Sequence, residues 1–256
     1  PIQSLFINLP RINRVRSAAR QIDMLMRIQG ERPDNALARA GRIGRGLIEF
    51  QRVSFRYSTY CDPALVGVDF RINPGEVLAI SGANGSGKST LMKLILGMYQ
   101  PQAGSILIDN VDIRQIDPLE LRRIIAYAPQ ESQFFRATIE QNLRFAQPDA
   151  TDEELIQALE MAGAFDQVQA LPGGLQFRVG DNTHELTGSL KQKLILARIY
   201  LTRASIILFD EPGSGLDEEG DACFMETIKA LKGRATVLFS SHRPSHIRLA
   251  DTLMVF

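Results

Sequence analysis

Apolar and polar residues alternate at the start of residues 47–256, and this alternation predicts strands. The stretch "LIEFQRVSFRYS" (47–58) follows the two-residue period of a half-buried strand. A second strand is predicted over "LVGVDFRI" (65–72). After the turn residues "NPG", the apolar run "EVLAIS" (76–81) predicts a short buried strand. This part of the chain is therefore expected to begin as a sheet.

The pattern becomes helical from about residue 131 to residue 202 and then returns to buried strands. Helices are predicted over "ATIEQNLRF", "TDEELIQALEMAG" and "LKQKLILARIYL". The runs "SIILFD" (205–210) and "ATVLFSS" (235–241) predict buried strands, with the helix "EEGDACFMETIKALKG" between them. Strands that alternate with helices at this spacing indicate an α/β sheet with helical crossovers.

The first 46 residues are basic. They contain nine Arg and three acidic residues, a balance of +6, although the whole chain has no net charge. "RINRVRSAARQIDMLMR" (11–27) predicts an amphipathic helix, and the Gly-rich, polar segment 32–46 predicts a linker. This basic pattern is consistent with an ordinary solvated helix. It is also consistent with the cytoplasmic end of a membrane span, where Lys and Arg concentrate. The helix's apolar positions at roughly helical spacing are Ile12, Val15, Ala19, Ile22 and Leu25 or Met26.

Composition excludes several classes of protein. A hydrophobic content of 45% is enough for a sizeable core, yet no apolar run approaches the ~20 residues that span a bilayer. Cys61 and Cys223 lie far apart and have no metal-ligating residues nearby, so we expect reduced thiols rather than a disulfide or zinc site. The basic segment lacks interleaved aromatic residues, and no nucleic-acid partner is expected.

A glycine-rich segment, "SGANGSGKST" (81–90), lies between the predicted strand 76–81 and a helix. It satisfies the GxxxxGK[ST] pattern, in which backbone N–H groups and a helix N-terminus surround a phosphate. Lys88 would reach the β- and γ-phosphates, and the Ser89 hydroxyl would ligate Mg²⁺. The residues expected to contact the nucleotide here are Gly82, Asn84, Gly85, Ser86, Gly87, Lys88, Ser89 and Thr90.

Two carboxylates follow the buried strand predicted over 205–210. Asp210 and Glu211 would lie at the carboxyl end of that strand, the edge at which α/β sheets bind ligands. Asp210 fits a Mg²⁺ ligand, acting through water. Glu211 is placed to orient and deprotonate an attacking water as general base.

These two motifs and the order of the stretches around them make residues 47–256 resemble the nucleotide-binding domain of ABC transporters. The resemblance implies a P-loop NTPase (RecA-like) α/β core, an N-terminal antiparallel β subdomain and an inserted α-helical subdomain over about 131–202. It also implies ATP and Mg²⁺ as ligands and ATP hydrolysis as the activity. The chain ends at "DTLMVF" within an expected strand, so the closing strand and helix of such domains are expected to be missing.

The resemblance assigns roles to four more residues. Tyr57 matches the aromatic residue that stacks on adenine, although it also fits the strand alternation of Val53 and Phe55. Gln130 in "IAYAPQ" matches the Q-loop glutamine, which reaches Mg²⁺ and the attacking water. Asp217 in "SGLD" matches the D-loop aspartate, and His242 in "LFSSH" matches the switch histidine that donates to the γ-phosphate. The catalytic set is then Lys88, Gln130, Glu211 and His242, and the metal set is Ser89, Gln130 and Asp210.

Two stretches resemble exporters rather than importers or soluble members. They are "PQESQFFRATIEQNLRF" after the Q-loop and "FRVGDNTHELTG", which resembles the exporter X-loop with Val179, Gly180 and Asp181. The implied partners are a membrane domain and a second nucleotide-binding domain. Residues 1–46 then become the basic helical tail of the last transmembrane helix plus a linker. The implied location is the cytoplasmic face of the inner or plasma membrane.

The segment "LTGSL" (186–190) stands where the family has the signature LSGGQ, whose helix N-terminus contacts the γ-phosphate held by the opposite subunit. Thr187 keeps a hydroxyl and Gly188 is retained. Ser189 replaces a glycine and adds a Cβ where backbone must approach phosphate, and Leu190 removes an amide. The signature is therefore expected to be impaired, whereas the residues that act on the chain's own nucleotide are complete.

That asymmetry predicts half of a heterodimeric exporter with one impaired ATP site. Two alternatives remain open at the level of sequence: a soluble ABC-type ATPase that acts on nucleic acid or ribosomes, and a nucleotide-binding regulatory module that scarcely hydrolyses ATP.

Overall fold

The computed structural model describes residues 16–17, 19–24, 26, 43–130, 134–180, 186–213 and 217–256. The chain divides into two compact units, Pro1–Ala36 and Leu37–Phe256. The described residues of the first unit are helical, and Ile22 and Met26 are exposed. Ala19 is also exposed, and the remaining predicted stripe positions, Ile12, Val15 and Leu25, lie outside the residues whose side chains are described. Within the described part of the chain, no helix is both long and apolar enough to span a bilayer.

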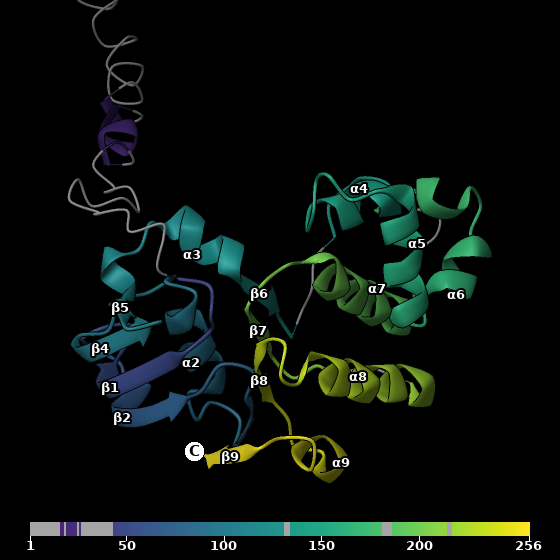
Figure 1. Ribbon diagram of the computed structural model, residues 1–256. Helices are drawn as coiled ribbons and strands as arrows, with labels where there is room; N and C mark the ends of the chain where they lie inside the picture. Colours follow the sequence, from purple (N-terminus) through teal and green to yellow (C-terminus); the bar gives the residue numbers. More distant parts are fainter. Residues whose placement is uncertain are drawn as a thin grey trace, which may run out of the picture. The chain divides into compact units, whose positions relative to one another are not determined.

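The second unit begins with an antiparallel sheet of order β2-β1-β4-β5 (Figure 1). Its strands are β1 (Ile48–Phe55), β2 (Leu65–Ile72), β4 (Ala103–Ile108) and β5 (Val111–Asp112). Ile48 and Phe50, and then Val53 and Phe55, are buried at the predicted two-residue period, but an irregularity in the pairing between Phe50 and Val53, where Arg52 has φ of 49°, interrupts the alternation. The strand ends at Phe55, three residues earlier than predicted, and Tyr57 therefore lies outside it.

A five-stranded parallel sheet of order β6-β7-β8-β3-β9 forms the centre of the unit. Its strands are β3 (Val77–Ser81), β6 (Ile125–Ala128), β7 (Ile206–Phe209), β8 (Thr236–Ser240) and β9 (Thr252–Val255). In this order β7, β8 and β3 are adjacent, so the loops after their carboxyl ends meet at one edge of the sheet.

Helices surround this sheet and also form a separate group. The helices that surround the sheet are α2 (Lys88–Ile95), α3 (Pro118–Ile124), α8 (Glu218–Leu231) and α9 (Pro244–Ile247). A 3₁₀ turn, η1, occupies Ile113–Gln115. Figure 1 shows α4 (Ile139–Arg144), α5 (Asp152–Met161), α6 (Phe165–Gln169) and α7 (Gly188–Leu201) grouped together. A second 3₁₀ turn, η2, occupies Gly174–Gln176. The elements between Ile139 and Leu201 fall in the stretch predicted to be helical.

Local sequence signals fix where these helices begin. Thr138 caps α4 and Thr151 caps α5, each within a capping box completed by Gln141 and Glu154 respectively. The polar residues before each apolar stretch thus satisfy backbone N–H groups that the helix leaves without a carbonyl partner.

The core lies on both faces of the parallel sheet. Along β3, Leu78 and Ile80 belong to the cluster shared with the antiparallel sheet and α2. Val77 and Ala79 face the opposite way, into the cluster shared with the helical group and α8. A sheet covered on both faces accounts for the uninterrupted apolar runs of its strands. The α/β fold, with its antiparallel β part and helical part, is the predicted class.

The sequence pattern missed the elements between residues 103 and 124. The strands β4 and β5 and the helix α3 are short, and β4 is defined by its antiparallel pairing with β1, about fifty to sixty residues earlier (Ser54 with Ala103, Ile48 with Ile108). Such pairing leaves no long periodic signal in the segment itself.

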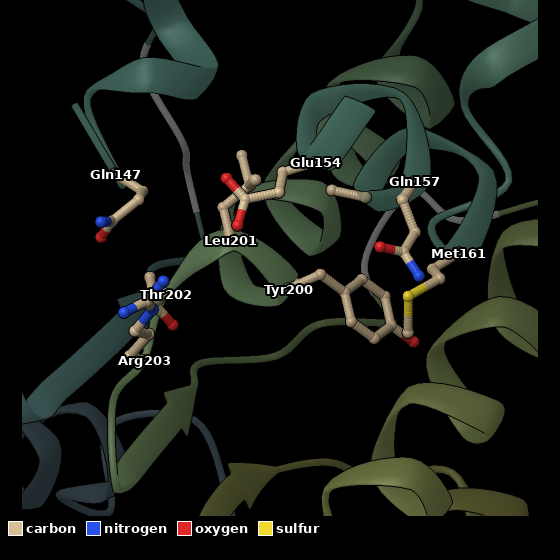
Figure 2. A pocket seen from close by; sticks show the side chains of 9 residues that line it. Gln147, Glu154, Gln157, Met161, Tyr200, Leu201, Thr202 and Arg203 are labelled. Carbon is tan, nitrogen blue, oxygen red and sulfur yellow. The ribbon is translucent and has the colours of Figure 1, made fainter. Parts of the chain in front are cut away.

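A pocket of about 160 Å³ lies within the helical group, between α5 and the carboxyl end of α7 (Figure 2). The hydroxyl of Tyr200, one of its lining residues, is 2.6 Å from Thr227 Oγ1 of α8. None of the predicted site residues lines this pocket. It is lined by Gln147, Glu154, Gln157, Ala158, Met161, Tyr200, Leu201, Thr202 and Arg203.

Candidate functional site: a nucleotide phosphate loop and an acidic strand end

The segment 82–90, named here the phosphate loop, joins β3 to α2. The N-cap of α2 is Gly87, with φ of 106° and no side-chain hydrogen bond to the helix. The first backbone N–H groups of α2 therefore have no side-chain cap, and they carry the positive end of the helix dipole. This is the arrangement in which a helix N-terminus binds an anion.

The glycines of the phosphate loop are required by space as well as by backbone angle. A Cβ on Gly87 would lie 2.5 Å from the carbonyl oxygen of Ala64, a contact that backbone cannot accommodate. Gly82 has φ of 154°, and a Cβ there would lie 3.0 Å from Ser86 Oγ. By contrast, nothing lies within 4 Å of a Cβ built on Gly85, where φ of 80° alone favours glycine.

The loop's polar side chains fit a phosphate. Lys88 is only 5% exposed, and its Nζ donates to the carbonyl oxygens of Gly82 (2.8 Å) and Ala83 (2.9 Å). Ser86 Oγ is the one buried side-chain polar atom in the described residues that has no hydrogen-bond partner. A buried hydroxyl without a partner is unfavourable, and a phosphate oxygen in the loop would satisfy it. The neighbouring Asn84 is exposed and Ser89 is half-buried.

Tyr57 lies next to the phosphate loop. Its hydroxyl is 3.0 Å from Thr90 Oγ1 of α2, and its ring packs edge-on against Phe55 and Tyr99, with centroids 5.0 and 5.2 Å away. Tyr57 is 48% exposed, so one part of the ring remains available to a ligand. Because β1 ends at Phe55, the alternative view of Tyr57 as an ordinary strand residue is not supported.

Asp210 follows β7 and is almost completely buried. Its Oδ1 accepts from Ser240 Oγ at 3.0 Å, and its Oδ2 accepts from the Tyr127 hydroxyl at 3.4 Å. The same Ser240 Oγ accepts from the backbone N–H of Glu211 at 2.8 Å. Ser240, at the end of β8, therefore fixes the position of both acidic residues.

Glu211 has φ of 49°, in the left-handed region that residues other than glycine rarely adopt. Backbone strain of this kind concentrates at functional sites, where the surrounding structure maintains it. The Glu211 carboxylate accepts from Gln130 Nε2 at 2.8 Å through Oε2, and its Oε1 lies 3.9 Å from His242 Nε2. The structure thus brings together three residues from separate loops that the sequence placed in one catalytic set.

Two residues of this site were not identified from the sequence. Ser240 stands two positions before His242, and Tyr127 stands three before Gln130. Burial raises the pKa of the Tyr127 phenol above its ordinary value, and the negative charge of Asp210 raises that pKa further. Tyr127 therefore stays protonated and able to donate to Asp210. In the sequence, only their positions close to His242 and Gln130 could have pointed to Ser240 and Tyr127, because both residues act through tertiary contacts.

The signature segment (186–190) opens α7. Thr187 is the N-cap, and its Oγ1 accepts from the backbone N–H of Leu190 at 3.2 Å. A Cβ on Gly188 would meet nothing within 4 Å. Leu190 is 4% exposed and packs in the core, so the residue that replaces the family's glutamine contributes to packing.

Ser189 contacts the D-loop aspartate of the same chain. Its Oγ donates to Asp217 Oδ2 at 2.6 Å, while Asp217 Oδ1 accepts from the Gly220 backbone N–H at 2.7 Å and caps α8. The hydrogen bonds from Ser189 and Gly220 lower the pKa of Asp217. The serine that replaces a glycine has thus acquired a partner within its own chain.

The predicted metal ligands do not form a closed cage of protein side chains. No group of three or more His, Cys, Asp or Glu residues able to hold a metal occurs in the described ranges. Ser89, Asp210 and Gln130 come from the starts or ends of three different elements, so a cation there would need oxygen ligands from the nucleotide as well. Such a shared site is usual for Mg²⁺, which binds through one or two carboxylates plus substrate phosphates. Of the predicted X-loop residues, Val179 and Gly180 are described and Asp181 lies outside the described residues.

Comparison with known proteins agrees with this geometry. The family model described as ABC transporter matches residues 65–214. The chain is 35% identical over 239 residues to an ATP-dependent lipid A-core flippase of Chromobacterium violaceum, and this match covers 93% of the chain and 41% of the flippase. It is 37% identical over 211 residues to the cyclolysin secretion/processing ATP-binding protein CyaB of Bordetella pertussis, covering 82% of the chain and 30% of CyaB.

A solved structure of a bacterial Atm1-family ABC exporter with ATP bound superposes with a TM-score of 0.84 at 32% identity. That match covers 99% of the chain and 46% of the exporter chain, so the present chain spans less than half the length of these relatives. The chain belongs to the ABC transporter family, as an ATPase domain of the exporter type.

Proposed function

We propose that this chain binds Mg·ATP at its phosphate loop and hydrolyses it with Glu211 as general base, as one half of an asymmetric pair of ATPase domains that powers export. The observation that carries the proposal is the convergence of Gln130 and His242 on the Glu211 carboxylate, at 2.8 and 3.9 Å. A carboxylate held between an amide and an imidazole can orient a water and accept its proton.

The phosphate loop supplies binding. Lys88 exchanges its contacts with the Gly82 and Ala83 carbonyl oxygens for the β- and γ-phosphates, and Ser86 Oγ gains its missing partner. Tyr57, half-exposed above Thr90, stacks on the adenine base. Backbone N–H groups at the start of α2 complete the anion site. The proposed nucleotide contacts in this loop remain Gly82, Asn84, Gly85, Ser86, Gly87, Lys88, Ser89 and Thr90.

Mg²⁺ would be held by Ser89, Gln130 and Asp210 together with the phosphates, where it neutralises charge that develops on the transferring phosphoryl group. Asp210 is oriented for this role because both of its oxygens already accept hydrogen bonds, from Ser240 and Tyr127. These bonds keep the buried carboxylate in place before a cation arrives.

Glu211 and His242 supply catalysis. The amide of Gln130 holds the Glu211 carboxylate, which takes a proton from the attacking water. His242 is half-exposed at the same edge, where its imidazole can donate to the γ-phosphate. None of these groups comes from a second chain, so the chain's own half of the site is complete.

The signature segment is the incomplete part. In the family pattern it contacts the nucleotide of the opposite domain, and here Ser189 carries a Cβ and is hydrogen-bonded to Asp217 of its own chain. Loss of a charge-assisted contact costs about 1.5–3 kcal/mol, or roughly ten- to a hundredfold. A homodimer would carry this defect at both ATP sites. A partner with an intact signature would complete the site built around Glu211 of this chain, so we propose a heterodimer.

The export role follows from the relatives. They include an ATP-dependent flippase and a secretion/processing ATP-binding protein, of whose lengths this chain covers 41% and 30%. We therefore propose that a membrane domain, on the same or a partner polypeptide, receives the motion of the ATPase pair, with this chain at the cytoplasmic face of the membrane. The Q-loop glutamine and the X-loop residues are the proposed coupling points.

A mixing experiment tests the division of labour. One chain carries Ser189→Gly together with Glu211→Gln, which removes the Cβ from the signature and also removes the base. When it is mixed with wild type, the wild-type Glu211 faces the repaired signature. We expect ATP hydrolysis about tenfold above that of wild type alone, and almost none from the double variant alone.

A chain carrying Ser189→Ala with Glu211→Gln is the matched control, because it loses the hydroxyl but keeps the Cβ. Mixing it with wild type should leave hydrolysis near the wild-type rate. Wild type alone that hydrolyses ATP as fast as the repaired mixture would contradict the asymmetric pair. Equal stimulation by the alanine control would show that the serine hydroxyl, and not its Cβ, limits the signature.

A further inference from the structure

A buried histidine outside the predicted catalytic set connects the elements of the site. His246 lies on α9, is fully buried and is hydrogen-bonded through both ring nitrogens. Its Nδ1 is 3.0 Å from Ser241 Oγ, and its Nε2 is 2.8 Å from Asp221 Oδ1 of α8. The ring also packs on Phe224, with centroids 4.8 Å apart. These residues are named the His246 network below.

The partners determine which ring nitrogen carries the proton. An ionised Asp221 can only accept, so His246 Nε2 must be the donor in that bond. In the neutral ring Nδ1 is then an acceptor, and the Ser241 hydroxyl donates to it. This direction agrees with the other contact of Ser241, whose Oγ accepts from the backbone N–H of Arg243 at 3.1 Å.

The His246 network reaches the turn that follows Glu211. The guanidinium of Arg243 pairs with Asp221 and donates to the carbonyl oxygen of Gly213 at 3.0 Å. A Cβ on Gly213 would lie 3.0 Å from Cε1 of His246, so the ring lies directly against that turn. One imidazole is therefore in contact with α8 and with the loops after β7 and β8.

The segment 240–242 is held from two sides. Ser240 contacts Asp210 and the Glu211 backbone, and the backbone N–H of Ser241 donates to the Ile80 carbonyl oxygen at 3.1 Å. The Ser241 side chain is held by His246 on the opposite side. The next residue, His242, is half-exposed and faces Glu211.

We propose that His246, through Ser241, is a positioning residue for His242 in ATP hydrolysis. This proposal rests on the proposed role of His242 and Glu211. Without the hydrogen bond to Ser241, the segment keeps its strand anchor at Ser240 but loses the contact next to His242. A displaced imidazole slows the chemical step while nucleotide binding at the phosphate loop stays unchanged.

Two variants of the network test the proposal. Each is made in the chain that keeps Glu211, and that chain is then mixed with the Ser189→Gly, Glu211→Gln chain. His246→Phe keeps a ring against Phe224 and loses both hydrogen bonds, whereas Ser241→Ala leaves the imidazole in place. Each should lower kcat roughly tenfold with KM for ATP within about twofold of wild type. His246→Asn, whose Oδ1 can accept from Ser241, should recover most of the lost kcat. The matched control is Ser245→Ala, an exposed position on the same helix, with no expected change.

Nuclear magnetic resonance of the ¹⁵N-histidine-labelled chain supplies a second measurement, because the sequence contains only three histidines. In wild type, His246 should carry a proton on Nε2, and addition of Mg·ATP should shift the His242 signals. In Ser241→Ala, the His242 signals should differ from wild type before nucleotide is added.

The outcomes separate the two proposals. Wild-type kcat in both His246→Phe and Ser241→Ala, with His242 signals unmoved, would overturn the positioning role alone. A wild-type chain that neither hydrolyses ATP in the mixture nor shows any response of His242 to Mg·ATP would overturn the proposed function, and the positioning role with it. A His246 protonated at Nδ1 and bare at Nε2 would contradict the network directly.

Discussion

Ser189 Oγ lies 2.6 Å from Asp217 Oδ2, which joins the first turn of α7 to the residue that caps α8. Neither residue belongs to the phosphate loop or to the acidic end of β7. The family pattern places the signature segment against the nucleotide of the opposite domain, so in the proposed pair of domains this bond ties that segment to the start of α8 of its own chain. The substitution from glycine to serine therefore adds a contact within the chain as well as a Cβ.

The pH dependence of stability should reveal this bond. Asp217 has a lowered pKa in the folded chain, with the Ser189 hydroxyl as the largest cause. A carboxyl whose pKa is lower in the folded state adds stability above its unfolded pKa, about 3.9, and loses it as the pH falls through the folded value. Ser189→Ala should remove part of this contribution.

We therefore expect the difference in free energy of unfolding between wild type and Ser189→Ala to be largest near pH 7 and to shrink below about pH 4. Urea denaturation at a series of pH values measures it. A difference that stays constant over the whole range would show that the hydroxyl does not interact with the Asp217 charge.

Tyr57 should contribute to nucleotide affinity through its ring. Tyr57→Ala should weaken Mg·ATP binding by roughly five- to a hundredfold, since stacking of a base on an aromatic ring contributes about 1–3 kcal/mol. Tyr57→Phe keeps the ring, loses only the contact with Thr90 Oγ1, and should bind nearly as wild type.

The matched control is Tyr60→Ala, because Tyr60 is 98% exposed and close in sequence. Fluorescence titration with an ATP analogue measures all three variants. Weakened binding in Tyr60→Ala with normal binding in Tyr57→Ala would transfer the adenine contact from Tyr57 to Tyr60.

Leu190 should matter for folding, although it stands in the signature segment. It is 4% exposed and packs in the cluster that includes Leu186 and Leu194. Leu190→Ala should lower the free energy of unfolding by about 2–5 kcal/mol, the range for large-to-small changes in a core. Leu119→Ala, at a position that is 55% exposed, should change it by less than about 0.5 kcal/mol. Equal stabilities of the two variants in chemical denaturation would refute the core role of Leu190.

The sequence predicted the parts of the site that are local. The phosphate loop is recognised from a strand, a glycine-rich segment and a helix that follow one another within residues 76–95. Asp210 and Glu211 are recognised because they end an apolar run. The α/β class followed from the order of strands and helices, and the helical stretch 131–202 from its periodicity. The family resemblance added that the first strands form an antiparallel subdomain and that the helices form an inserted one.

Contacts between distant residues were not predictable in the same way. Tyr127 and Asp210 are 83 positions apart, Ser240 and Asp210 are 30 apart, and His246 and Asp221 are 25 apart. The first two bonds depend on which strands become neighbours in the parallel sheet, and the third depends on the packing of α9 against α8. A hydroxyl or an imidazole next to a motif carries no local pattern that reveals such a partner.

Ser189 is a further residue whose contact could not be predicted from the sequence. The sequence alone indicated only that Ser189 replaces a glycine of the family pattern and adds a Cβ where the backbone would approach phosphate. The hydrogen bond to Asp217 depends on the approach of α7 to the start of α8, which the sequence does not specify.

The central claim is that this chain binds Mg·ATP through its own phosphate loop. Isothermal titration calorimetry of the wild-type chain in magnesium buffer should detect binding, and Lys88→Ala should weaken it by at least about tenfold. Lys93→Ala, in the last turn of the same helix, should bind as wild type. Absence of any Mg·ATP binding by the wild-type chain, or equal affinities of the wild-type and Lys88→Ala chains, would contradict the account.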